Sequence, residues 1–340
     1  MTAANAVLVL LWISITSYAV LAGADFGGGI WDLFSGSTSR GMRQRLRIAA
    51  SIGPVWEANH VWIIFALVIL WTGFPPVFAA IMSTLYIPLT LVAFGVIVRG
   101  SSFALRQAAP QLALKRAFGP GFAIASLVTP FFLGTVAGAM ASGRVPPGIA
   151  RGDTLLSWTG PTSLLGGVLA VAGCAYLAAV YLCVDARRDG EYDLVEVFRK
   201  RALIAGAVCA LIALAGIDVL RLDAPRLYHG LLGNGLPILL ASAALSSAAL
   251  LLLWRRMFAF TRILSALAVV TVLWAWAVAQ YPDLLVGSTT VAQAAAPAAT
   301  LTALIIAVAI GSVFLVPSLA LLFWMVRLPR TVDARQKVES

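Results

Sequence analysis

The chain has 340 residues, of which 61% are apolar and only 11% carry a formal charge. Soluble domains contain roughly 25% charged residues, so a chain with a mean hydropathy of +0.95 is not expected to disperse in water. The net charge of +10 would suggest a nucleic-acid partner in a soluble protein. In a membrane protein an excess of Lys and Arg reports orientation instead. We therefore predict an all-α, polytopic membrane protein with residues 1–340 as one integral membrane domain, and no nucleic-acid partner.

Nine apolar stretches are long enough to cross a membrane, since a spanning helix needs about 20 apolar residues. The run 52–98 is nearly unbroken, but two prolines within 72–76 predict a tight hairpin between two spans. Residues 286–300 are expected to form a weakly ordered loop. The predicted spans are 6–31, 52–71, 77–98, 118–142, 162–184, 202–220, 235–254, 263–281 and 300–326.

Basic residues gather in alternate connections between these spans. Twenty of the 24 Lys and Arg residues fall on one side, and Arg99 and Arg106 are counted there, after the third span. Cytoplasmic connections carry the excess of Lys and Arg. The pattern therefore predicts a periplasmic N-terminus and a cytoplasmic C-terminus, which agrees with an odd number of spans.

Five ionisable side chains fall within or at the ends of the spans, namely Asp25, Asp32, Glu57, His60 and Asp218. Each costs roughly 2.5–3.5 kcal/mol on insertion scales, so such residues are the first place to look for a function. Asp32 lies at the end of its span and is expected to sit at the membrane interface.

Asp25, Glu57 and His60 are predicted to lie at a similar depth. Glu57 and His60 are three residues apart and share a helix face. At 1.5 Å per residue, all three lie about 8 to 12 Å from the cytoplasmic boundary. An antiparallel pair of spans would bring them together, and we predict that they transfer protons. The alternative is a hydrogen-bonded contact that holds the helices together.

The remaining polar residues predict structure rather than chemistry. Asp218 and Arg221 are also three residues apart, at the outer end of the sixth span, and are expected to form a structural ion pair. A bis-histidine haem needs two buried imidazoles, and only His60 lies within a span. The three cysteines have no C-x-x-C spacing. No catalytic, cofactor-binding or metal-binding residue is therefore predicted in this chain.

Two motifs carry a resemblance to a known family. Residues 22–29 are close to D-G-F-D-x-G-x-G, with Ala22 in place of the first Asp, and residues 281–285 match the last outer loop of the same family. The second span follows G-P-x-W-[DE]-x-N-x-V-W through Gly53, Pro54, Trp56, Glu57, Asn59, Val61 and Trp62. On these residues the chain resembles subunit II of the bd-type quinol oxidases, and Glu57 with His60 is closer to the cyanide-insensitive branch.

The resemblance implies a subunit of a quinol:dioxygen oxidoreductase in the bacterial cytoplasmic (inner) membrane. Its partner would be a haem-bearing subunit I with haems b and d. This chain would hold no haem, would stabilise its partner and would help deliver cytoplasmic protons for the reduction of dioxygen to water. A small accessory subunit and a structural quinone are left open. Two alternatives remain, a proton-coupled secondary transporter that uses Asp25 and Glu57, and a purely structural scaffold.

Overall fold

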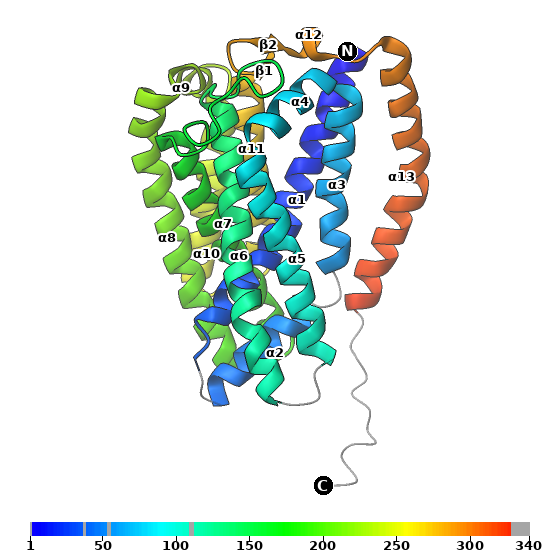
Figure 1. The fold of residues 1–340 in the computed structure, drawn as a ribbon. Helices are drawn as coiled ribbons and strands as arrows, with labels where there is room; N and C mark the ends of the chain where they lie inside the picture. Colours follow the sequence, from blue (N-terminus) through cyan, green and yellow to red (C-terminus); the bar gives the residue numbers. More distant parts are fainter. Residues whose placement is uncertain (1, 37–38, 53–55, 109–111, 328–340) are drawn as a thin grey trace.

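The computed structural model describes residues 2–36, 39–52, 56–108 and 112–327. Helices account for almost all of them, which confirms the all-α prediction (Figure 1). In chain order the elements are α1 (Ala3–Leu33), α2 (Ser39–Ile52), α3 (Trp56–Gly73), α4 (Pro75–Thr84), α5 (Tyr86–Ala108), α6 (Leu112–Ala141), α7 (Pro161–Arg188), α8 (Tyr192–Asp223), α9 (Pro225–Leu232), α10 (Leu236–Trp254), α11 (Thr261–Gln280), β1 (Asp283–Leu285), β2 (Thr289–Thr290), α12 (Val291–Ala294) and α13 (Ala298–Arg327).

Long helices run side by side between two ends of the molecule (Figure 1). At the basic end, α2 lies across the bundle and carries Arg43, Arg45 and Arg47. At the opposite end, called the loop end here, lie α4, α9, the β-strands and α12. Within the described ranges, eight helices are long and apolar enough to cross a membrane. They are α1, α5, α6, α7, α8, α10, α11 and α13, and the 18-residue α3 runs alongside α1.

The predicted spans 52–71 and 77–98 are wrong in their boundaries. Helix α2 ends at Ile52 and α3 begins at Trp56, while Gly53 and Pro54 lie outside the described residues. Prolines 75 and 76 occupy the first turn of α4, where a missing N–H costs no hydrogen bond, so they begin a short helix instead of closing a hairpin. The membrane-crossing helix is α5, which continues to Ala108. Arg99 and Arg106 therefore lie inside a helix and not in a connection.

The prediction of a weakly ordered loop at 286–300 is also wrong. Strands β1 and β2 pair antiparallel, with Asp283 opposite Thr290. Gly287 adopts a positive φ of 73° in the turn between them, a conformation that glycine adopts without strain. Thr290 then caps α12 through a reciprocal capping box with Gln293. Local hydrogen bonds thus order this segment at the loop end.

Glycines in α1 allow its neighbours to approach closely. A Cβ atom at Gly27 would lie 1.8 Å from the Cys174 carbonyl oxygen of α7, and one at Gly29 would lie 2.1 Å from Ser126 Oγ of α6. Small residues of this kind let membrane helices pack backbone to backbone. Helix α1 consequently lies against α3, α6 and α7, and its polar residues are turned toward side chains from several helices.

Helix α2 is held to the connection between α7 and α8 by arginines. Arg47 donates to Asp189 at 2.6 Å and lies 2.8 Å from Glu191, while Arg43 binds Asp193. These charge-assisted contacts tie the segment after α1 to a distant part of the chain, and they close the basic end over the buried residues of α1.

Candidate functional site

Asp25 forms a buried ion pair with Arg99. The Arg99 Nη2 donates to Asp25 Oδ1 at 2.6 Å and to the Asp25 carbonyl oxygen at 3.2 Å. The two side chains are only 1% and 2% exposed. The guanidinium also lies 4.9 Å from the ring centroids of both Phe26 and Phe122, a distance at which the ring faces attract a cation. Nε completes the set by donating to Ser126 Oγ at 3.0 Å.

This arrangement offsets part of the cost of placing two charges inside the bundle. A buried charge is tolerated when it is paired and its remaining hydrogen-bonding groups are satisfied. Ser126 accepts from Arg99 while its own hydroxyl donates to the Phe122 carbonyl oxygen at 2.7 Å. Arg99 was missed as a site residue because the third span was expected to end at residue 98.

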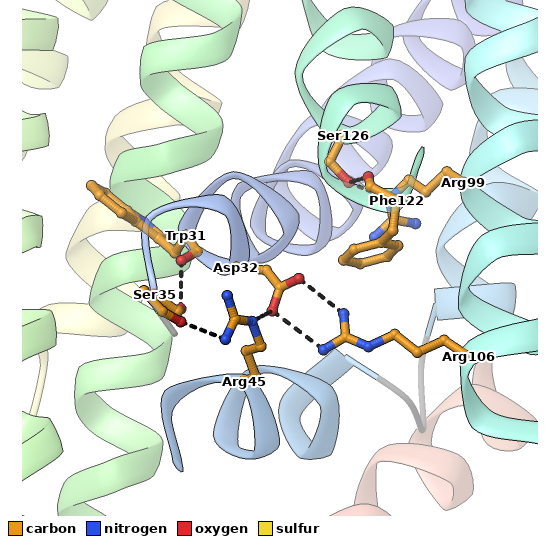
Figure 2. A network of polar contacts seen from close by, with 9 residues as sticks. Trp31, Asp32, Ser35, Arg45, Arg99, Arg106, Phe122 and Ser126 are labelled. Carbon is orange, nitrogen blue, oxygen red and sulfur yellow. Dashed lines mark hydrogen bonds and ion pairs between the residues drawn. The ribbon is translucent and has the colours of Figure 1, made fainter. Parts of the chain in front are cut away.

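A second ion pair lies two helical turns closer to the basic end (Figure 2). Arg106 binds Asp32 at 2.9 Å, and Arg45 of α2 lies 3.4 Å from the same carboxylate. Asp25 and Asp32 are seven residues apart, as are Arg99 and Arg106. Two pairs therefore join α1 to α5 about 10.5 Å apart along the helices. The matched spacing of seven was a signal in the sequence that could have revealed both pairs.

His60 lies among aromatic rings next to the first ion pair, Asp25–Arg99. Its ring centroid lies 5.9 Å from those of Tyr18 and Phe26 and 6.3 Å from that of Trp56. Asp25 and Arg99 both act on it electrostatically. Helices α1 and α3 thus place Asp25 and His60 near each other, on either side of Phe26. The two do not hydrogen-bond each other, and Phe26 contacts both His60 and the Arg99 guanidinium.

Glu57 belongs to the first turn of α3, but its side chain lies outside the described residues. The other motif residues of α3 have structural contacts. Asn59 donates from Nδ2 to the Leu21 carbonyl oxygen of α1 at 3.4 Å, and Trp56 and Trp62 pack against the core near the basic end. Residues of the second-span motif thus help to hold α3 against α1 and the core.

Several polar atoms in this region are buried without a hydrogen-bond partner among the described residues. They include Tyr18 Oη, Asp25 Oδ2, Asn59 Oδ1 and both ring nitrogens of His60. Tyr18, Asp25 and Asn59 are 6%, 3% and 2% exposed. Buried polar atoms are nearly always hydrogen-bonded in folded proteins, so a cluster of unpaired ones marks a place where other groups make contact.

The predicted ion pair between Asp218 and Arg221 is wrong. Both side chains are exposed, and no ion pair joins them in the described part of the chain. The ion pair at this end of α8 is formed by Asp223 and Arg144 through both guanidinium nitrogens. Asp223 also accepts from the Thr162 N–H at 2.9 Å. Hydrogen bonding to this carboxylate raises the pKa of Arg144. Arg144 thus binds Asp223 through two parallel N–H···O bonds, the strongest geometry for an arginine–carboxylate pair.

Comparisons with known proteins agree with this fold and these motifs. The family described as cytochrome bd terminal oxidase subunit II matches residues 3–326. The cytochrome bd-I ubiquinol oxidase subunit 2 of Escherichia coli (strain K12) is 30% identical over 220 residues, which are 62% of this chain and 56% of that protein. The cytochrome bd ubiquinol oxidase subunit 2 of Bacillus subtilis (strain 168) is 27% identical over 218 residues, or 63% and 62% of the two chains. These matches span less than two thirds of the curated relatives.

The fold agrees over a greater length. A chain in the structure of bd oxidase from Geobacillus thermodenitrificans superposes with a TM-score of 0.77 at 24% sequence identity, and the match covers 97% of this chain and 100% of that chain. The likeness in fold therefore extends over nearly the whole chain. Because the family match covers nearly the full length, this chain belongs to the cytochrome bd terminal oxidase subunit II family.

Proposed function

We propose that this chain is the haem-free subunit II of a bd-type terminal quinol oxidase in the bacterial cytoplasmic membrane. In this role it stabilises a haem-bearing subunit I and contributes to the delivery of cytoplasmic protons for the reduction of dioxygen to water. Quinol and dioxygen are the substrates of the complex. Membership of the subunit II family favours this role over the secondary transporter.

The proposal includes the orientation of the chain. We infer that the basic end faces the cytoplasm, since Arg43, Arg45 and Arg47 gather there on α2. Helix α3 would be the ninth span, beside the eight longer helices. The polar cluster around Asp25 would then lie in the half of the membrane nearer the cytoplasm.

The observation that carries the proton-delivery role is the buried cluster around the Asp25–Arg99 pair. Charged groups inside a membrane bundle are costly and commonly mark a proton or ion pathway. Protonating Asp25 would leave the Arg99 guanidinium buried without its counter-ion, so we assign Asp25 the role of a fixed negative charge. Its second oxygen, Oδ2, has no partner among the described residues and stays available to a hydrogen-bond donor. Glu57 and His60 are the proposed carriers.

The residues of this chain do not fit a haem. A haem iron needs an axial ligand such as His, and His60 is the one histidine in a predicted span. Rings of Tyr18, Phe26 and Trp56 lie around it at centroid distances of 5.9 to 6.3 Å, and both ring nitrogens are buried, so neither is open to a haem iron. We therefore place haems b and d in the partner subunit, in agreement with a complex that is named as a cytochrome.

The test is a conservative substitution at Glu57 in the purified complex. Glu57→Gln removes a titratable proton while keeping the side-chain length, and we expect slower quinol-dependent oxygen uptake with haem content and the partner retained. Glu196→Gln is the matched control, because Glu196 forms a partly exposed ion pair with Arg199 at the basic end of α8. Unchanged turnover in Glu57→Gln would remove Glu57 from the pathway. Isolation of the native chain as a colourless homo-oligomer would refute the oxidase role itself.

A further inference from the structure

Tyr18 lies on the same stripe of α1 as the two paired carboxylates. Tyr18, Asp25 and Asp32 are seven residues apart in turn, so they stand one above another along the helix at intervals of about 10.5 Å. The two carboxylates have arginine partners, whereas the Tyr18 hydroxyl has no partner among the described residues. Tyr18 is the member of the stripe that lies farthest from the basic end.

His60 connects this stripe to the surface of α3. Its ring contacts that of Tyr18 at 5.9 Å between centroids, and its side chain is half-buried. Val61, Ile64 and Trp71 of the same helix are 47%, 59% and 64% exposed. His60 and Ile64 are four residues apart and share a helix face. Both ring nitrogens are buried, so the imidazole lies between a buried polar cluster and the apolar, exposed surface of α3.

The apolar surface next to this buried titratable ring is where we expect a protein partner. Ionisable groups in membrane spans face the interior of a bundle or another polar group, because hydrocarbon satisfies none of their hydrogen bonds. Both ring nitrogens of His60 lack a partner within the described chain. The surface that contains Ile64 and Trp71 is thus the place where a neighbouring subunit would meet the cluster.

We propose that Tyr18 and His60 form the exit of the proton route, carrying protons from the vicinity of Asp25 across α3 to the partner subunit. This proposal rests on the proposed function. The hydroxyl of Tyr18 donates its proton as its oxygen accepts another, and His60 accepts a proton at one ring nitrogen while releasing one from the other. Neither residue changes its net protonation over a cycle. Asp25 and Arg99 hold the local charge constant, and water, which offers both donors and acceptors, completes the hydrogen bonds.

The decisive variant is Tyr18→Phe in the complex with its partner subunit. It removes one hydroxyl and leaves the ring that packs against Phe26 and His60. We expect kcat for quinol-dependent oxygen uptake to fall about tenfold or more, since a positioned proton-transfer group contributes roughly 10²–10⁴-fold. The KM for quinol and the haem spectrum should be unchanged. In proteoliposomes a pH dye should report slower proton uptake in a single turnover, and the solvent isotope effect on kcat should rise.

Tyr176→Phe is the matched control. Tyr176 is 6% exposed, as Tyr18 is, and its hydroxyl is hydrogen-bonded to Ser265 at 2.8 Å, away from the cluster. Its loss should lower thermal stability without slowing proton uptake. Normal kcat and normal proton uptake in Tyr18→Phe would overturn the proposal.

His60→Gln is a second test of the same proton route. It keeps one donor and one acceptor but does not titrate, and we expect the same pattern as for Tyr18→Phe. If Glu57→Gln slows turnover while Tyr18→Phe and His60→Gln do not, the exit is wrong and His60 is not a carrier, but the oxidase role and proton delivery through Glu57 stand. If the complex shows no quinol-dependent oxygen uptake at all, the proposed function fails first.

Discussion

Removing one partner of the Asp25–Arg99 pair should destabilise the protein far more than removing both. In Arg99→Met the carboxylate of Asp25 stays buried, with a side chain 2% exposed, and breaking a buried pair in this way costs about 3–5 kcal/mol. In the double variant Asp25→Asn with Arg99→Met, no charge remains. The Arg99–Asp25 side-chain bond is lost too, but removing a buried ion pair as a whole is close to neutral because the desolvation cost goes with it. The net loss is then the hydrogen bonds from Arg99 to Ser126 and to the Asp25 carbonyl oxygen, at about 1 kcal/mol each.

The expected order is therefore a loss of about 3–5 kcal/mol for the single variant and about 2 kcal/mol for the double variant. Thermal unfolding of the purified complex, followed by loss of the haem absorbance and by subunit dissociation, measures this order. Arg43→Met is the control, since the pair of Arg43 with Asp193 is 52% and 45% exposed and such pairs contribute about 1 kcal/mol or less. A double variant no more stable than Arg99→Met, or an Arg99→Met variant as stable as the native chain, would refute the reasoning.

Two further substitutions test the packing and the second ion pair. Gly27→Ala places a Cβ atom 1.8 Å from the Cys174 carbonyl oxygen, so α1 and α7 must separate. We expect the free energy of unfolding to fall by about 1–3 kcal/mol, and less of the partner subunit to co-elute in size-exclusion chromatography. Gly173→Ala, with nothing within 4 Å of its new Cβ atom, should leave stability equal or slightly higher, and equal losses at both glycines would contradict the packing argument. Arg106→Gln should cost less than Arg99→Met in the same unfolding assay, because Arg106 is 22% exposed and Asp32 keeps Arg45. An equal or larger cost would contradict the argument that deeper burial makes the Asp25–Arg99 pair the more sensitive of the two.

The amino-acid sequence determined the class of the protein and its most costly residues. An 11% charge content in a chain of mean hydropathy +0.95 leaves membrane helices as the consistent solution. The same scarcity of charge made Asp25 and His60 visible, and the depth predicted from helix rise brought them to one level, where the structure places them around Phe26. The motif of the second span identified the family, which the comparison confirms.

The tertiary structure decided which helix each polar side chain faces. Hydropathy placed Arg99 in a connection, because a cation usually ends a span, whereas the long arginine side chain reaches Asp25 from a helix 74 residues away in sequence. Asp218 and Arg221 were adjacent on one helix, yet Arg144 from a distant loop binds the carboxylate of Asp223 instead. Tyr18 gave no signal at all, since an aromatic residue in an apolar helix is ordinary. Periodicity fixes the height and face of a residue on its own helix, but its partners depend on how the helices pack against each other, and in this protein the close approach at Gly27 and Gly29 sets that packing.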